Sequence, residues 1–124
     1  PNRDAEGYNP LCGDELHVYL RVDAAGRIDD IGFEGSGCAI SKASASLMTA
    51  AVKGKAVTEA VELFEQFREM VTAEVDAPVD DQRLGKMAVF AGVREFPMRV
   101  KCATLAWHTM KAAIAEDQSP VSTE

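Results

Sequence analysis

Three cysteines and one aspartate occur in sequence contexts that together predict a metal site. Cys12 and Asp14 flank a glycine, where a tight turn can aim both side chains at one point. Cys38 follows a glycine-rich stretch, and Cys102 lies near the start of a C-terminal helical pattern. The cysteines are too far apart for a local zinc finger, so only the fold could bring them together. Three thiolates and a carboxylate oxygen would suit zinc, or iron in a cluster; the alternative is three unrelated buried thiols.

The surroundings of these residues favour deprotonated thiols and ligand exchange. Cys38 is predicted to begin a helix, where unpaired backbone N–H groups and the helix dipole stabilise a thiolate. Asp14 is a harder ligand than sulfur and is easier to displace, which suits a site that does chemistry. The histidines are poor alternative ligands. His17 falls on the polar face of a predicted strand, and His108 points away from Cys102 around a helix.

Composition limits the possible classes of function. The chain has 124 residues, 47% of them hydrophobic and 27% charged, as expected for one globular domain. A formal net charge of -7 lacks the basic footprint of a nucleic-acid binder. No apolar run reaches the roughly 20 residues that span a bilayer, so we expect no membrane segment. Free thiols without a recognisable signal segment favour the cytoplasm, and three cysteines cannot pair completely within one chain.

The apolar pattern predicts strands first and helices afterwards. The expected strands are 16–22 and 27–34, the second with a bulge near Asp29 and Asp30. The expected helices are 38–52, 57–71, 84–92 and a last helix from Pro97. The last helix should carry a buried stripe of Ala103, Trp107, Met110 and Ile114. We expect residues 1–14 to form an extended approach, residues 72–83 an acidic loop, and the tail from Glu116 to be frayed. This order indicates an α+β fold, a small antiparallel sheet packed against helices on one face.

Three motifs closely resemble those of the IscU/NifU-like iron–sulfur cluster assembly family. They are Asn9-Pro10-Leu11-Cys12-Gly13-Asp14, Gly35-Ser36-Gly37-Cys38-Ala39-Ile40-Ser41-Lys42-Ala43-Ser44-Ala45-Ser46 and Arg99-Val100-Lys101-Cys102-Ala103-Thr104-Leu105-Ala106-Trp107. The resemblance covers nearly the whole chain and implies one domain over residues 1–124, with the α+β fold of the family. It also implies that the three cysteines and Asp14 converge at one exposed end. The family usually begins with an N-terminal helix, which the residues before Cys12 do not predict, so we expect that helix to be missing from this sequence.

Two features resemble the SufU-like branch of this family. The classical scaffolds have a histidine immediately before the third cysteine, where this chain has Lys101. The stretch between Cys38 and Cys102 also looks longer than in the classical scaffolds. An insertion around residues 76–84 would account for the extra length, as in the SufU-like branch.

The branch resemblance implies a zinc-dependent sulfurtransferase. Such a protein accepts sulfane sulfur from a PLP-dependent cysteine desulfurase of the SufS type and serves the downstream SUF machinery of cluster assembly. Zn²⁺ would be held by Asp14, Cys38, Cys102 and Cys12. The catalytic acceptor would be Cys12, freed when a desulfurase histidine replaces it on the metal.

Two other interpretations remain open. The same four ligands could assemble a [2Fe–2S] cluster, which would make the chain a scaffold, or the zinc could be structural in a binding module. Arg99, one helical turn before Cys102, could contact Asp14 or a partner, or simply be solvated. Lys101 is expected to be a partner-facing or supporting residue of the site.

Overall fold

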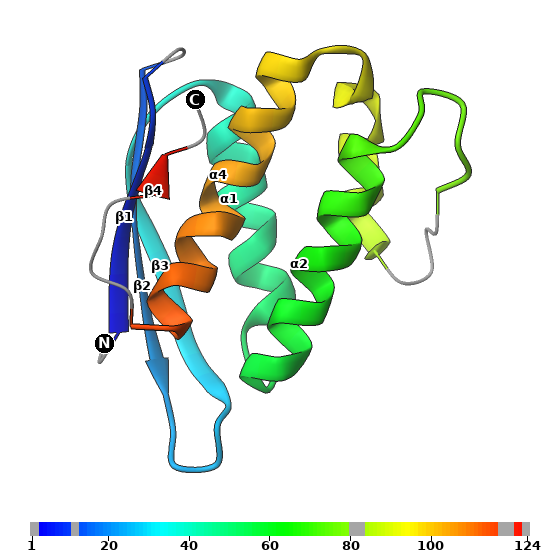
Figure 1. Ribbon diagram of the computed structural model, residues 1–124. Coiled ribbons are helices and arrows are strands. Elements are labelled where there is room, and N and C mark those ends of the chain that lie inside the picture. The colour runs from blue at the N-terminus through cyan, green and yellow to red at the C-terminus, as the bar shows by residue number, and fades with distance from the viewer. Residues whose placement is uncertain (1–2, 11–12, 80–83, 117–120, 123–124) are drawn as a thin grey trace.

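The computed structural model describes residues 3–10, 13–79, 84–116 and 121–122, which form two layers (Figure 1). A β-sheet makes one layer, and the described helices lie on one side of it. This arrangement confirms the α+β architecture that the sequence predicts. In the described part of the chain, no helix is long and apolar enough to cross a membrane.

The sheet has the strand order β3-β2-β1-β4. Its centre is the predicted hairpin, in which β2 (Asp14–Val22) pairs antiparallel with β3 (Ile28–Ser36). Gly26 in the connecting turn has a φ of +80°, in the left-handed region that glycine adopts easily. The hairpin therefore forms as its alternating pattern and turn residues predict.

The predicted bulge lies at the start of β3. Arg21 pairs with Asp30, whereas the next residue, Val22, pairs with Ile28. Asp29 is thus the extra residue on β3, and the break in alternation along the sequence reflects it.

The apolar pattern does not predict two of the strands. Residues Arg3–Asn9, expected only to be extended, form β1 and pair antiparallel with β2. The inward positions of β1 hold Ala5, Gly7 and Asn9, which are small or polar, so the alternation that marks a strand is weak. The tail that we expected to fray contributes β4 (Val121–Ser122), which pairs in parallel with β1.

The helices begin and end near the predicted residues. They are α1 (Ala39–Val52), α2 (Val57–Thr72), η1 (Gly85–Glu95) and α4 (Pro97–Ile114). Segment η1, predicted as a short helix, is a 3₁₀ helix. Its buried residues Met87, Phe90 and Val93 recur every third position, which matches the three residues per turn of a 3₁₀ helix.

Trp107 of α4 joins the helices to one another. Its ring stacks on Phe64 and Phe67 of α2, with centroids 6.2 and 4.9 Å apart. Its Nε1–H donates to the hydroxyl of Ser44 on α1 at 3.2 Å, and that hydroxyl donates to the Ala103 carbonyl at 2.5 Å. All five residues are buried or nearly so, and the contacts fix α1 and α2 against α4.

The predicted apolar stripe of α4 is confirmed. Ala103, Trp107 and Met110 have no exposed surface, and Ile114 is half-buried at the end of the helix. Burial of this stripe holds α4 in place along its whole length.

Arg94 of η1 holds the acidic loop that follows α2. Its guanidinium donates to the carbonyl of Met70 at 2.5 Å and to that of Ala77 at 2.7 Å. The predicted loop is therefore confirmed as far as residue 79, and residues 80–83 lie outside the described part of the chain.

Helix α4 packs closely on β1 at Gly7. A Cβ atom at this position would lie 2.1 Å from Oγ1 of Thr109 and 3.2 Å from Cδ1 of Leu105. Thr109 is fully buried, and its hydroxyl donates to the Leu105 carbonyl at 2.7 Å. The Thr109 side chain therefore has little room to move away from an added Cβ atom. The close approach of α4 to the sheet requires glycine at position 7.

We predict that Gly7→Ala destabilises the protein by about 1–3 kcal/mol, the usual range for overpacking a buried site. Gly32→Ala on β3 is the matched control, because a Cβ there meets no atom within 4 Å. The control should lie within about 1 kcal/mol of the wild type. Urea unfolding followed by Trp107 fluorescence measures both. Equal midpoints for the two variants would contradict the close approach at Gly7.

Candidate metal centre

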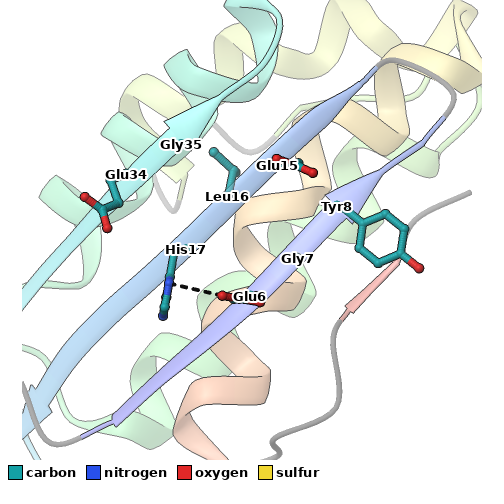
Figure 2. Close-up of a pocket in the computed structure, with 8 residues that line it drawn as sticks. All are labelled: Glu6, Gly7, Tyr8, Glu15, Leu16, His17, Glu34 and Gly35. Atoms are coloured by element: carbon teal, nitrogen blue, oxygen red, sulfur yellow. Dashed lines mark ion pairs between the residues drawn. The ribbon is translucent and has the colours of Figure 1, made fainter.

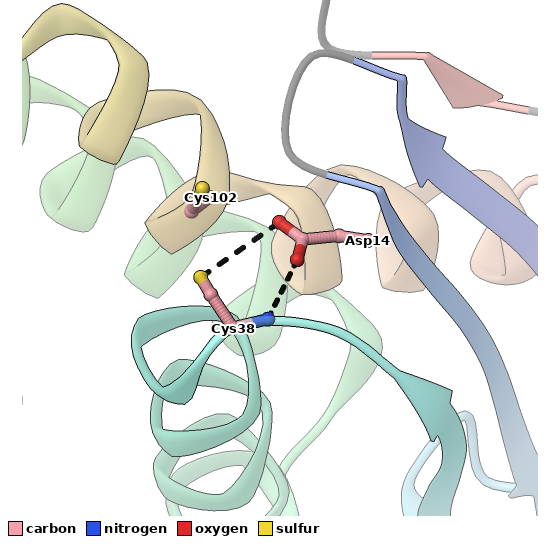
Figure 3. A group of neighbouring side chains, drawn as sticks. All are labelled: Asp14, Cys38 and Cys102. Atoms are coloured by element: carbon pink, nitrogen blue, oxygen red, sulfur yellow. Dashed lines mark hydrogen bonds between the residues drawn. The ribbon is translucent and has the colours of Figure 1, made fainter.

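Asp14, Cys38 and Cys102 converge at one end of the molecule, where β2 and α1 begin and the first turns of α4 pass (Figure 3). One ligand atom from each residue lies within 4.8 Å of the other two. The structure therefore brings together three of the four residues singled out in the sequence. The fourth, Cys12, lies outside the described residues. It is joined to Asp14 through Gly13, whose φ of +72° is left-handed.

Cys38 is the N-cap residue of α1. Its backbone is extended, and its Sγ accepts a hydrogen bond from the N–H of Ser41 at 3.5 Å. A side chain that accepts at this position satisfies an N–H group without a partner inside the helix. The start of α1 thus holds the Cys38 sulfur in a defined position.

The Asp14 carboxylate is fully buried, and the backbone around Cys38 holds it. Its Oδ1 accepts the Cys38 N–H at 2.7 Å, and its Oδ2 lies 3.9 Å from Cys38 Sγ. A Cβ atom at Gly37 would lie 2.5 Å from Asp14 Oδ1, so glycine is needed for the carboxylate to come this close. The glycine before Cys38 is therefore part of the site.

Asn9 is a residue of the site that sequence reasoning missed. Its side chain is fully buried at the end of β1, and its Nδ2 donates to Cys102 Sγ at 3.7 Å. Such a donor orients the sulfur. Asn9 precedes Pro10, a pair that is typical of turns, so only the pairing of β1 could have indicated its burial.

Arg99 and Lys101 lie in the first turns of α4, as expected. The Arg99 guanidinium is exposed and lies 4.4 Å from the centre of the Phe96 ring. Phe96 and Met98 are 43% and 50% exposed, so this end of α4 presents both apolar and cationic groups. Between the described side chains of Arg99 and Asp14 there is no ion pair, so the surface position is the one observed.

His108 lies away from the cysteine sulfurs, as its place on the helix predicts. Its ring packs edge-on against Phe64, with centroids 4.9 Å apart. Burial lowers the pKa of His108, and the nearby positive charges of Arg68 and Lys111 lower it further. A neutral imidazole in this setting is a packing residue of the helical layer.

The outer face of the sheet carries a separate hollow of about 520 Å³ (Figure 2). Its lining includes His17, whose Nε2 lies 2.6 Å from Asp4 Oδ2 and whose Nδ1 lies 3.6 Å from Glu6 Oε1. His17 is half-buried among these carboxylates rather than freely solvated, and the described residues that line the hollow include no thiol. Asp14, Cys38 and Cys102 are not among the residues that line this hollow, so it is separate from the candidate metal centre.

The cluster suits zinc in donor type and in spacing. A tetrahedral zinc with bonds of about 2.3 Å to sulfur and 2.1 Å to oxygen would hold its ligands roughly 3.6–3.8 Å apart. The donor atoms of Asp14, Cys38 and Cys102 already lie within 4.8 Å, so a movement of about 1 Å would bring them to that spacing. A buried carboxylate also needs a compensating charge or hydrogen bonds, and a cation among these atoms would provide the charge. Zinc and the iron of a cluster both fit this donor set.

The family of the chain follows from its sequence profile. Residues 2–103 match the family described as the NifU-like N-terminal domain. The chain belongs to this family of iron–sulfur cluster assembly proteins. The resemblance noted in the three motifs is thus confirmed, and one residue from each motif, Asp14, Cys38 and Cys102, lies in the cluster.

Two curated relatives and one crystal structure are notably similar. Over 106 residues the chain is 45% identical to the iron-sulfur cluster assembly scaffold protein IscU of Streptococcus pyogenes, a match that covers 86% of this chain and 65% of that protein. This chain therefore spans slightly less than two thirds of the length of that relative. Over 111 residues it is 40% identical to the zinc-dependent sulfurtransferase SufU of Bacillus subtilis, covering 89% of this chain and 73% of that protein.

The solved structure is a putative iron-sulfur cluster assembly scaffold protein for the SUF system from Fervidobacterium islandicum. It superimposes with a TM-score of 0.82 at 38% identity, covering 91% of this chain and 80% of that chain. The fold is therefore that of the IscU/SufU-like proteins.

We predict that Gly37→Ala weakens zinc binding without unfolding the protein. The added Cβ would push the Asp14 carboxylate away from the Cys38 N–H, and losing such a supporting contact typically lowers metal affinity 10–100-fold. Competition with a chromophoric zinc chelator measures the affinity. Gly92→Ala is the control, because a Cβ there meets no atom within 4 Å. Wild-type affinity in Gly37→Ala would show that the carboxylate does not depend on this contact.

Proposed function

We propose that this chain is a zinc-dependent sulfurtransferase that accepts persulfide sulfur from a PLP-dependent cysteine desulfurase of the SufS type for iron–sulfur cluster biogenesis. The observation that carries the proposal is the fully buried Asp14 carboxylate beside two cysteine sulfurs. Structural zinc sites are usually built from cysteine and histidine alone, whereas a carboxylate ligand suits a site that exchanges ligands. The 40% identity to a protein named as a zinc-dependent sulfurtransferase supports the same conclusion.

Sulfur transfer would be a thiol–persulfide exchange at Cys12. Its thiolate attacks the outer sulfur of the donor's cysteine persulfide, a new S–S bond forms, and the donor's own cysteine leaves as a thiolate. The products are a persulfide on Cys12 and a reduced donor cysteine, so no further oxidant or reductant is needed. Bound zinc would keep its cysteine ligands deprotonated at neutral pH. The reaction requires reduced thiols, which favours the cytoplasm.

The remaining ligands are suited to stay in place during the transfer. Cys38 is tied into the cap of α1, Cys102 is buried in α4, and Asp14 is held by the Cys38 N–H. Cys12 belongs to the short connection between β1 and β2. Its place in the sequence, between two strands rather than within a helix, makes Cys12 the best candidate for the acceptor.

The start of α4 is suited to dock the sulfur donor. Phe96, Met98 and Arg99 are exposed there, one to two turns from Cys102. Exposed aromatic, methionine and arginine side chains are enriched in protein interfaces. Downstream SUF components would take up the sulfur after the donor has left.

The second candidate function is a scaffold that assembles a [2Fe–2S] cluster on the same ligands. Its support is the 45% identity to a protein named as such a scaffold. Lys101 stands immediately before Cys102, where we expect a histidine in the classical scaffolds. This difference favours the sulfurtransferase.

The metal content of the purified protein discriminates between the two functions. We expect about one tightly bound zinc per chain, because mixed sulfur and oxygen donors in a tetrahedral arrangement suit it. Zinc and iron are quantified together by mass spectrometry, and the same sample is tested for acceleration of a SufS-type desulfurase. Full activity in a sample with stoichiometric iron and no zinc would establish the scaffold function instead.

Cys12→Ala should leave a folded protein that does not accept sulfur. Three ligands and a water can still complete a zinc shell, but no thiolate remains to attack the persulfide. The assay is peptide mass spectrometry after mixing with desulfurase and cysteine, and wild type should carry one extra sulfur on Cys12. Cys38→Ala is the comparison variant, because it should lose zinc as well. A label on Cys38 or Cys102 of wild type would show that Cys12 is not the acceptor.

A further inference from the structure

The helical layer carries an open groove of about 470 Å³ between α1 and α2, with the start of η1 along one side. Both helices pack on α4 and on η1, but they have few direct contacts with each other. The space between them is therefore only partly filled by the side chains of the protein itself.

The floor of this groove is apolar. Leu47, Ala50 and Ala51 are three and four residues apart on α1, so they share one face of the helix. Leu63 of α2 and Met87 of η1 also line the groove. Leu47, Ala51 and Leu63 pack against the core and stay half-buried, while Ala50 is exposed. A contiguous apolar surface of this kind is typical of a binding site.

Two lysines border the apolar floor. Lys55, in the connection between α1 and α2, and Lys86 of η1 both line the groove and are exposed. Neither forms an ion pair within the described part of the chain, whereas the neighbouring Lys53 pairs with Asp30 at 3.6 Å. The described lining residues include no carboxylate, although the chain has a formal net charge of -7. The groove is thus a positively charged place on an acidic protein, and it fits a partner that carries carboxylates.

The elements around the groove determine the form of the partner segment. The described lining residues belong to helices and to the turns beside them, so the groove offers no strand edge to pair with. The backbone of the bound segment must then satisfy its own polar groups, as an α-helix does. The small side chains of Ala50 and Ala51 allow such a helix to come close, and a helix in an apolar groove is a common mode of recognition.

We propose that this groove docks an amphipathic helix of a partner protein, with apolar side chains against Leu47 and Leu63 and carboxylates beside Lys55 and Lys86. The groove residues of α1 follow Cys38 by 9 to 13 positions, which is about 14–20 Å along a helix. A helix bound there leaves the end of the molecule with the metal centre uncovered, so this partner can bind together with a sulfur donor. The inference goes beyond the proposed function and requires no metal.

The test uses a fluorescent synthetic helix of about 18 residues, or five turns, with leucine on one face and glutamate on both sides of it. A matched peptide has lysine in place of every glutamate. Fluorescence anisotropy should show saturable binding of the glutamate peptide, about tenfold tighter than the lysine peptide and weaker at high salt. Amide NMR shifts should place the peptide at Leu47, Ala50 and Leu63. No saturable binding, equal affinities or shifts confined to the outer face of the sheet would overturn the proposal.

Charge reversal separates docking in the groove from a general effect of net charge. Lys55→Glu and Lys86→Glu should each weaken binding of the glutamate peptide about three- to tenfold, because each replaces an attraction with a repulsion. Lys42→Glu makes the same charge change at an exposed position of α1 that does not line the groove, and should match wild type. Equal affinities for the three variants would contradict the proposal. A dimer in sedimentation equilibrium that the peptide dissociates would assign the groove to a second copy of the chain instead.

Discussion

Burial of the Asp14 carboxylate is the constraint on which the rest of the site depends. A charged group removed from water must be met by hydrogen-bond donors or by an opposite charge. The backbone N–H of Cys38 donates a hydrogen bond to Oδ1 of Asp14, and Oδ2 of Asp14 lies near the Cys38 sulfur. This contact demands glycine at position 37 and draws the start of β2 to the start of α1. One interaction therefore positions both the candidate oxygen ligand, Asp14, and the nearest candidate sulfur ligand, Cys38.

Packing within the helical layer places the second sulfur, that of Cys102, at the site. Trp107 stacks on α2 and donates to Ser44 of α1, which fixes α4 beside α1. With α4 held in this way, Cys102 faces Asn9 at the end of β1 and lies within ligand distance of Asp14 and Cys38. A metal bound here would connect a strand and two helices, so its binding energy would contribute to the stability of the fold.

The surroundings of the two described sulfurs suit ligands that stay in place. Cys38 and Cys102 belong to helices and have donors directed at them from Ser41 and Asn9. Cys12 belongs to the connection between β1 and β2, next to a glycine with left-handed φ. Two sulfurs held in this way suit a metal that stays bound, and the proposed acceptance of sulfur would then fall to Cys12.

The sequence by itself determined the central hairpin, the three long helices and the candidate ligands, because each rests on a local signal. Alternation marks β2 and β3, helical periodicity marks α2 and α4, and short motifs surround each cysteine. Only the tertiary structure decided that Arg3–Asn9 is a strand, since its inward residues are small or polar and its pairing partner defines it. It also decided the 3₁₀ form of η1 and the contacts that Asn9 and Gly37 make at the candidate site. These features depend on contacts between residues that lie far apart in the sequence, and a local sequence pattern cannot predict such contacts.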